Sequence, residues 1–197
     1  MHREILTEKQ NELLPYLIEF KRKFYLVGGT AIALHLGHRR SVDFDLFCLS
    51  RLNKKDIREK LKKNPFRIVR LSEDTDQLHL IINDVKVTFF AYPYKINHSL
   101  MLGEYLSLPS LLTLSSMKAF ALGRRAKWKD YVDLFFILKN FLTISEISKE
   151  AEQIFGQLYS EKLFREQLAF HKDIDYSETV EYMIDPPSDD EIREFLI

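Results

Sequence analysis

The sequence of 197 residues lacks the features by which secreted and membrane proteins are usually recognised. Its single cysteine, Cys48, allows no disulfide bond within the chain, as is typical of proteins in a reducing compartment. No apolar run approaches the roughly 20 residues that cross a bilayer. The charged N-terminus also has no apolar core like that of a signal peptide. We therefore expect a cytoplasmic protein that makes no contact with membranes.

The chain also lacks a net charge, since 29 Lys and Arg residues balance 29 Asp and Glu residues. Its overall charge therefore gives no attraction to nucleic acid, and a site for a polyanion would have to come from local clustering of cations. Internal repeats and low-complexity linkers are missing as well. With 46% hydrophobic and 29% charged residues, the composition is that of an ordinary globular protein.

Hydrophobic periodicity predicts an α+β lobe over residues 1–100 and a helical lobe over residues 101–197. In the first lobe helices alternate with strands, and an Asn-Asp pair at 83–84 suits a hairpin turn. The predicted strands are 24–27, 42–49, 66–71, 78–82 and 85–92, and the predicted helices are 4–23 (interrupted near Pro15), 30–36, 53–63, 110–122, 128–141, 144–158, 161–170 and a short one capped by Ser188.

Two adjacent glycines, Gly28 and Gly29, lie between a short apolar run and a predicted helix. They let the backbone turn sharply and let a phosphate approach the amide N–H groups without a Cβ in the way. We expect Thr30 to cap the helix, whose positive N-terminal end would face the same phosphate. A purely structural turn is the commoner explanation for such a pair when it stands alone.

An Asp-x-Asp pair, Asp43 and Asp45, lies on the predicted strand that follows. Residues two apart on a strand point to the same face, so both carboxylates face one way while Val42, Phe44 and Leu46 face the core. Two adjacent carboxylates repel each other unless a cation lies beside them. Mg²⁺ suits such a pair, because it takes one or two carboxylates and completes its octahedron with water and phosphate oxygens. The alternative is a half-exposed strand with acidic residues outward.

A basic loop with the sequence His38-Arg39-Arg40-Ser41 comes just before this strand. Arginine binds phosphate oxygens in a bidentate manner, so the loop could hold a triphosphate, although a solvated turn would have the same composition. The order strand, Gly-Gly, helix, basic loop and Asp-x-Asp strand brings phosphate-binding amides and metal-binding carboxylates to the same end of a sheet. That combination favours a functional site over three unrelated features.

Further cations gather between two predicted helices of the second lobe. Lys118 and Arg125 are seven residues apart, which aligns them if one helix continues through Gly123. We predict that this segment grips phosphates or an RNA backbone and that Trp128 stacks on a base, a solvated basic turn being the alternative. The cations concerned are Arg124, Arg125, Lys127 and Lys129.

Two aspartates follow these cations. Asp133 precedes an apolar run and needs a partner at the edge of the core, for which Arg124 or Arg125 could serve. We therefore interpret Asp133 as structural and regard Asp130 as the better candidate for the site.

Residues 24–31 (FYLVGGTA) and 38–47 (HRRSVDFDLF) together resemble the AbiEii/AbiGii toxin family of nucleotidyltransferases. A second block, 117–134, is similar to the lysine, basic loop and Lys/Arg-Asp-x-x-Asp pattern in the helical part of that family. The resemblance implies a DNA-polymerase-β-like fold with a mixed sheet, and a cleft completed by the helical lobe. It also implies Mg²⁺, a nucleoside triphosphate, transfer of a nucleotide to tRNA or another RNA, and a toxin–antitoxin or phage-defence role with a cognate antitoxin.

The resemblance also implies roles for individual residues. Asp43 and Asp45 would bind the metal and, with Lys118 and Asp130, form the catalytic set. The triphosphate would be held by Lys118 and by the nucleotide-binding residues Gly28, Gly29, Thr30, Arg39, Arg40, Ser41 and Arg125.

The sequence departs from the family's pattern at one position. Nucleotidyltransferases of this fold commonly carry a third carboxylate on a later strand, and the matching position here is Thr88. A threonine cannot act as a carboxylate base or a strong Mg²⁺ ligand. Two alternatives to an active enzyme therefore stay open: a catalytically degenerate protein of the same fold that binds a nucleotide or RNA, and an interaction protein that uses the acidic C-terminal tail from 173 to 194.

Overall fold

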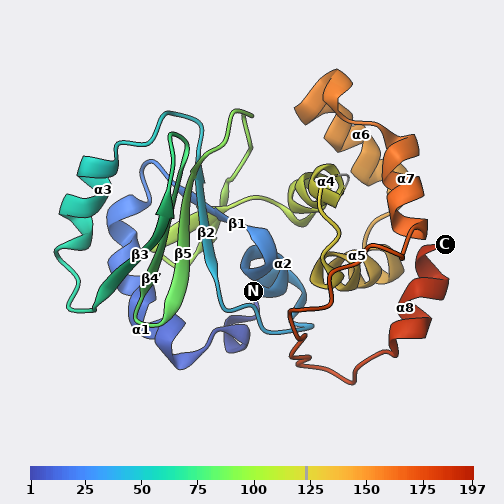
Figure 1. Cartoon of the computed structure of the whole chain (residues 1–197), viewed down its shortest axis with the longest axis horizontal. Helices are drawn as coiled ribbons and strands as arrows, with labels where there is room; N and C mark the ends of the chain where they lie inside the picture. The colour runs from blue at the N-terminus through green and yellow to red at the C-terminus, as the bar shows by residue number, and fades with distance from the viewer. Residues whose placement is uncertain (123) are drawn as a thin grey trace.

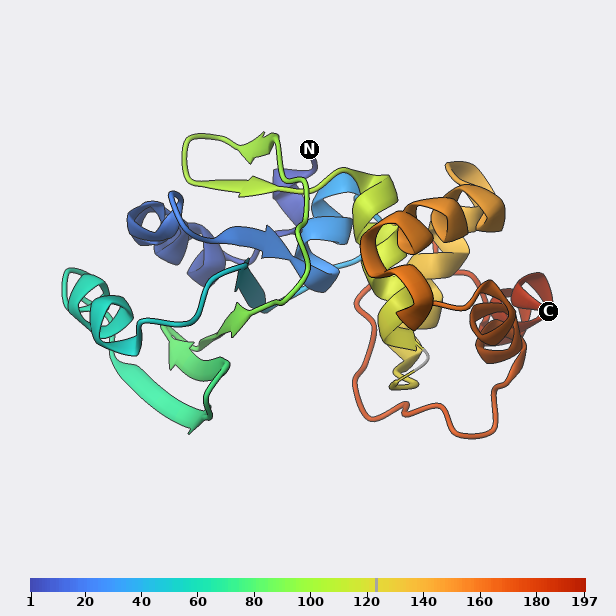
Figure 2. The ribbon, with the colours of Figure 1, turned by 90° about the horizontal axis from the view of Figure 1, so that it is seen from above.

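The computed structural model describes residues 1–122 and 124–197, and within them the strands form one seven-stranded mixed sheet in the order β3-β4-β5-β2-β1-β7-β6. Helices α4 to α8 gather on one side of this sheet in both ribbon views (Figures 1 and 2). The α+β fold predicted from the sequence is therefore confirmed. The strands are β1 (Tyr25–Val27), β2 (Phe44–Cys48), β3 (Ile68–Glu73), β4 (Gln77–Ile82), β5 (Val85–Ala91), β6 (Leu100–Leu102) and β7 (Leu106–Leu108). The helices are α1 (Glu8–Leu17), α2 (Gly28–Leu36), α3 (Lys54–Leu61), α4 (Leu111–Leu122), α5 (Trp128–Asn140), α6 (Ile144–Phe155), α7 (Glu161–Ala169) and α8 (Asp189–Leu196), with single 3₁₀ turns at Arg3–Ile5, Ile18–Phe20 and Gly156–Leu158.

The centre of the sheet is built from β1, β2 and β5. β2 runs antiparallel to β1 and parallel to β5, and its residues alternate between buried and partly buried. Phe44 and Leu46 point into the core, as predicted, and the intervening Asp45 points to the other face. The hairpin between β4 and β5 is also confirmed. Its two turn residues, Asn83 and Asp84, have φ values of 53° and 59°, which suit a two-residue turn.

Helix α2 connects the sheet to the helical part of the chain. It contacts β1 and β2 on one side and α4 and α5 on the other. Further aromatic contacts link α4 to α6, where the rings of Phe120 and Phe155 stack with centroids 3.9 Å apart. Within the described residues, no helix combines the length and the apolar character that crossing a bilayer requires.

Several predicted boundaries were wrong. Helix α2 begins at Gly28 rather than Thr30, and β2 begins at Phe44, so Val42 precedes the strand and is 50% exposed instead of buried. Pro15 lies inside α1, which ends only two residues later. Strands β6 and β7 have no counterpart in the prediction, and through them the sheet continues to Leu108, past the lobe boundary placed near residue 100. The division into two lobes stays a prediction.

The segment 171–188, which we call the C-terminal strap, runs from α7 back across α5 to the start of β2 before it reaches α8 (Figure 1). The main chain of its Glu181 accepts a hydrogen bond from Arg40 N at 2.8 Å, and its Met183 donates one to His38 O at 2.9 Å. Near the start of α5, Trp128 N donates to Asp175 O at 3.0 Å. The strap therefore joins the helical part to the loop that leads into β2.

Candidate active site

The paired aspartates lie at the beginning of β2, between two neighbouring strands. Asp45 is opposite Val27 at the end of β1 and opposite Thr88 of β5. Burial first, and then the negative charge of Asp43, raise the pKa of the Asp45 carboxyl, while a hydrogen bond from Thr88 opposes this shift. Burial also raises the pKa of the Asp43 carboxyl, although the charge of Lys86 lowers it. The two carboxylates therefore repel each other in a partly buried position.

This arrangement fits a divalent cation that a substrate helps to hold. Within the part of the chain that the structure describes, His, Cys, Asp and Glu residues form no cluster of three or more that could enclose a metal ion. Asp43 and Asp45 alone would leave most positions of an octahedron to water and phosphate oxygens, which is the usual environment of Mg²⁺. A cation beside the pair would also relieve the repulsion that raises the pKa of Asp45. The residues present therefore fit Mg²⁺.

The Gly28-Gly29 turn lies against these carboxylates. Gly28 has φ = +74°, and a Cβ built on it would collide with Asp45 Oδ2. A Cβ on Gly29 would lie 2.7 Å from Arg39 Nη2 and 3.0 Å from Ser41 Oγ. Both glycines are thus required by close packing at the N-terminus of α2, next to the proposed metal ligands.

We expect Gly28→Ala to destabilise the fold by more than the cost of a positive φ alone, because the new methyl group must displace Asp45. The matched control is Gly103→Ala, since Gly103 has φ = +57° and an added Cβ would meet only the Tyr105 ring, at an ordinary contact distance of 3.5 Å. The control should lose about 1–2 kcal/mol of unfolding free energy, and Gly28→Ala should lose clearly more in urea denaturation. Equal losses would show that Asp45 is not held against the glycine.

The predicted role of Thr30 as a helix cap is wrong. The helix begins at Gly28, its N-cap is Val27, and that residue makes no capping bond through its side chain. The buried hydroxyl of Thr30 instead donates to the main-chain oxygens of Ser41, at 3.2 Å, and of Asp43. Thr30 thereby fixes the backbone that enters β2, and only its main-chain N–H remains for a phosphate contact.

Arg39 is part of a buried ion network, in contrast to its predicted place in a phosphate-binding loop. It is 2% exposed, and its Nε and Nη2 donate to the two carboxylate oxygens of Asp133 at 2.7 and 2.9 Å. His38 Nε2 lies 2.8 Å from Asp133 Oδ1, and Lys118 Nζ lies 2.8 Å from Oδ2. Asp133 is structural, as predicted, but its partners are these three residues rather than Arg124 or Arg125.

Lys118, Asp130 and Arg125 meet at the edge of this network. Lys118 Nζ donates to Asp130 Oδ1 at 2.6 Å, and Arg125 Nε donates to Asp130 Oδ2 at 3.1 Å. The two cations are therefore brought together, but not along one helix, because α4 ends at Leu122. Gly123, through which the helix was predicted to continue, lies outside the described residues. The positive charge of Arg125 also lowers the pKa of Asp45, which connects this group to the aspartate pair.

Three of the remaining predicted cations pair with the C-terminal strap, whereas Arg124 donates to Phe120 O at 2.7 Å and lies over the Phe120 ring. Arg40 Nε donates to Glu181 at 2.6 Å, and Lys127 and Lys129 both pair with Glu178, the latter at 3.3 Å. Ser41 is partly buried, with its hydroxyl close to Gly29. The acidic residues of the C-terminal strap thus neutralise part of the positive charge of Arg40, Lys127 and Lys129.

Trp128 is not available for base stacking, so that prediction is wrong. It is 5% exposed and packs against Tyr176 of the strap, with ring centroids 5.1 Å apart, while Arg193 lies over its ring. A tryptophan in a basic segment looks the same in sequence whether its ring is free or covered. The strap that covers it lies 43 to 60 residues later in the sequence.

The sequence analysis missed two residues beside the aspartates. Lys86 precedes Thr88 by two positions on β5, and its charge lowers the pKa of both Asp43 and Asp45. His79 of β4 is opposite Thr88, and its Nδ1 lies 3.2 Å from Thr88 Oγ1. The two-residue turn at 83–84 could have revealed this neighbour, because it pairs Ile82 with Val85 and hence 79 with 88.

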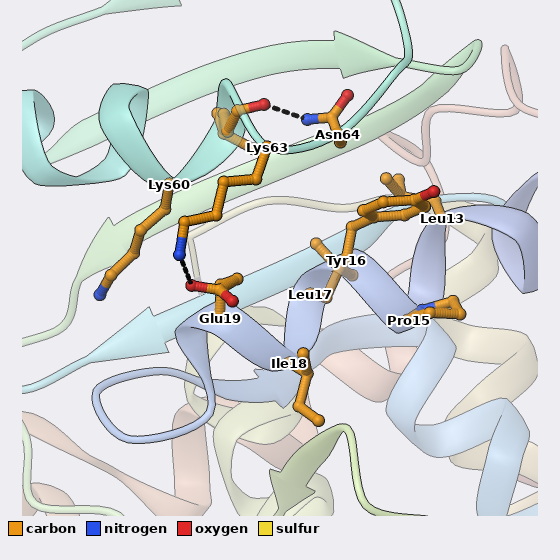
Figure 3. Close-up of a pocket in the computed structure, with 10 residues that line it drawn as sticks. Leu13, Pro15, Tyr16, Leu17, Ile18, Glu19, Lys60, Lys63 and Asn64 are labelled. Atoms are coloured by element: carbon orange, nitrogen blue, oxygen red, sulfur yellow. Dashed lines mark hydrogen bonds and ion pairs between the residues drawn. The ribbon is translucent and has the colours of Figure 1, made fainter.

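A cavity of about 240 Å³ lies elsewhere, between α1 and the end of α3 (Figure 3). Its lining combines apolar side chains of α1 with Lys60 and Lys63 of the α3 region, and Lys63 pairs with Glu19 at 2.8 Å. It includes none of the residues that surround Asp43 and Asp45. That cavity is therefore separate from the candidate active site.

Comparisons with known proteins agree with this geometry. A model of the family described as nucleotidyl transferase AbiEii toxin, type IV toxin–antitoxin system, matches residues 16–96, which include the Gly-Gly turn, the aspartate pair and Thr88. An uncharacterized protein of Aquifex aeolicus (strain VF5) is 30% identical over 142 residues, which are 68% of this chain and 68% of that protein.

Solved structures show the same fold. MenT4, a nucleotidyltransferase toxin from Mycobacterium tuberculosis H37Rv, superposes with a TM-score of 0.65 at 16% identity, over 95% of this chain and 78% of its own. A crystal structure from H. pylori superposes with a TM-score of 0.53 at 15% identity, over 81% of this chain and 89% of its own. With the family's sequence motifs placed around one site of this fold, the chain belongs to the AbiEii family of nucleotidyl transferase toxins of type IV toxin–antitoxin systems.

Proposed function

We propose that the protein is an Mg²⁺-dependent nucleotidyltransferase that moves a nucleoside monophosphate from a nucleoside triphosphate to an RNA acceptor, with tRNA as the first candidate. The observation that carries the proposal is the position of Asp43 and Asp45. They lie between the glycine turn at the start of α2 and the β5 strand, with the charge of Lys86 acting on both carboxylates and that of Arg125 acting on Asp45. In a cell the protein would act in the cytoplasm as a toxin that a cognate antitoxin restrains.

Each part of the site has a task in this reaction. The main-chain N–H groups of Gly28 and Gly29 and the positive end of α2 would receive the β- and γ-phosphates. The Lys118 ammonium donates to Asp130 and forms an ion pair with Asp133, and its remaining N–H would bind a phosphate oxygen. Asp43 and Asp45 would hold Mg²⁺, which when bound offsets negative charge on the attacking and leaving oxygens.

The experiment is incubation of the purified protein with total cellular RNA, Mg²⁺ and each of the four α-labelled nucleoside triphosphates in turn. Labelled RNA of a defined length is expected with at least one nucleotide. Loss of this labelling on adding EDTA would support a requirement for the metal ion. Size and sequence of the labelled band identify the acceptor.

The second candidate function, nucleotide or RNA binding without turnover, rests on Thr88. Thr88 is in register with Asp45, at the place where a third carboxylate is common, and it is only 7% exposed. Nucleotide binding by calorimetry, together with no labelled RNA under any condition, would favour this alternative.

We expect Glu178→Gln to strengthen RNA binding, because it frees Lys127 and Lys129 from their shared partner. Two more cations contacting a single strand should steepen the dependence of log K on log salt by about 1. Fluorescence anisotropy with labelled single-stranded RNA over a salt series measures the slope. The control Glu194→Gln removes an exposed charge on α8 and should leave it unchanged. An unchanged slope for Glu178→Gln would show that the two lysines do not reach RNA.

A further inference from the structure

A row of polar side chains crosses three strands at the level of the metal-binding pair. Asp45 of β2, Thr88 of β5 and His79 of β4 are register partners, so their side chains share one face of the sheet. His79 Nδ1 lies 3.2 Å from Thr88 Oγ1. The row continues to Gln77, whose Oε1 lies 2.8 Å from His79 Nε2.

The contact with Gln77 orients the imidazole. An amide oxygen only accepts hydrogen bonds, so with Gln77 Oε1 facing it Nε2 carries the proton of the neutral ring, and Nδ1 keeps an electron pair to which the Thr88 hydroxyl can donate. The pair on Nδ1 points toward the Thr88 hydroxyl. A basic nitrogen is thus placed beside the position where other proteins of this fold carry a carboxylate, and it reaches that position from the next strand.

The geometry of an in-line displacement at phosphorus determines which substrate would bind beside Thr88 and His79. The attacking and leaving oxygens are on opposite sides of the α-phosphorus. The glycine turn that would hold the leaving phosphates is on the β1 side of β2, because Gly28 packs on Asp45 where Asp45 is opposite Val27. The acceptor must then approach from the other side of β2, over β5 and β4, where Thr88 and His79 lie.

We propose that His79 is the general base of the transfer and takes the place of the third carboxylate, a proposal that rests on the nucleotidyltransferase function given above. The O–H bond of the acceptor ribose breaks as its proton passes to His79 Nδ1. The freed oxygen bonds to the α-phosphorus, the bond from that phosphorus to the bridging oxygen breaks, and pyrophosphate leaves with the electron pair. The imidazolium returns its proton to water after the product leaves.

The decisive variant is His79→Gln. Glutamine can keep a hydrogen bond to Thr88 but cannot accept a proton, so a merely structural histidine would be replaced with little loss. For a general base we expect kcat to fall by about 10²-fold, with the KM for the triphosphate unchanged because its contacts are on the other side of β2. His171→Gln, in the helical part where His171 bonds to Leu168 O, is the matched control and should keep the wild-type rate.

A second variant keeps the test independent of how well His79→Gln folds. Thr88→Asp restores a carboxylate next to Asp45, so in that background His79→Gln should cost less than about threefold instead of about 10²-fold. Single and double variants are compared by kcat and by thermal melting. A full 10²-fold loss in the Thr88→Asp background, or a His79→Gln enzyme within threefold of the wild type, would overturn the assignment of His79.

The wild-type assay separates this inference from the function on which it depends. If the wild type labels no RNA with any nucleoside triphosphate, the proposed function itself fails. If the wild type labels RNA and His79→Gln labels it at the same rate, only the role of His79 fails.

Discussion

Replacing Asp45 by Asn should reduce the rate of nucleotide transfer by about 10³-fold while leaving the metal-free protein as stable as the wild type or more so. The reduction follows from removing one of the two carboxylates that would hold Mg²⁺. The stability follows from burial and from Asp43, which raise the pKa of Asp45 above its ordinary value. The unfolded chain then holds the charge of Asp45 more easily than the folded chain does, so near pH 7 the charged group costs folding free energy.

The sign of this effect is open to direct measurement. A carboxyl whose pKa is raised on folding favours the folded state more as the pH falls toward that pKa, so the gain from Asp45→Asn should shrink as the pH falls and vanish below the unfolded value of about 4. Thermal melting of the two proteins in EDTA at several pH values tests the predicted stability, and transfer rates in Mg²⁺ test the predicted loss of activity. Asp84→Asn serves as the control, because Asp84 is exposed at the β4–β5 turn and pairs only with Lys9. A variant that is inactive merely because it has unfolded would contradict the account of Asp45.

Replacing Asp133 by Asn should have the opposite effect and destabilise the fold by about 3–5 kcal/mol, the cost of breaking a buried ion pair. Asp133 is fully buried and binds Arg39, Lys118 and His38, which come from the loop before β2 and from α4. Burial alone would raise the pKa of Asp133, but the charges of Arg39 and Lys118 together with the bond from His38 hold it well below its ordinary value. The variant would leave these cations buried without their counter-ion.

The pH dependence of this stabilisation follows from the direction in which folding shifts the pKa of Asp133. A carboxyl whose pKa is depressed in the folded state contributes its full stability above the unfolded value near 4, and loses it as the pH falls toward the lower folded value. Urea denaturation of the wild type and of Asp133→Asn should therefore differ most at neutral pH and converge in acid. Asp76→Asn, at an exposed loop position, should match the wild type throughout. A constant difference at all pH values would mean that the charge of Asp133 is not what stabilises the network.

The parts of the site that the sequence predicts correctly depend on local periodicity. Alternation along the strand is enough to place Asp45 on the face opposite Phe44 and Leu46, which uses only the two-residue repeat of a strand. Thr88 is identified through the resemblance to the family, and the register between β2 and β5 places it next to Asp45.

The wrong predictions concern side chains whose partners are distant in sequence. Arg39 is in a motif that suits phosphate, but its partner Asp133 is 94 residues away, and the resulting bidentate ion pair is buried. Trp128 is covered by Tyr176 of the strap in a similar way. A pattern of residue types identifies a cation or an aromatic ring, whereas the tertiary packing decides whether its polar atoms or its faces remain free.

The measurement that tests the central claim most directly compares two labels of the same nucleoside triphosphate, one at the α-phosphate and one at the γ-phosphate. Both are incubated with the wild-type protein, Mg²⁺ and the RNA acceptor, with Asp45→Asn as the inactive control. Nucleotidyl transfer predicts that the α-label enters the RNA, that the γ-label leaves as pyrophosphate in equal amount, and that Asp45→Asn does neither. Entry of the γ-label into RNA, or equal α-labelling by Asp45→Asn, would contradict a nucleotidyl transfer centred on Asp43 and Asp45.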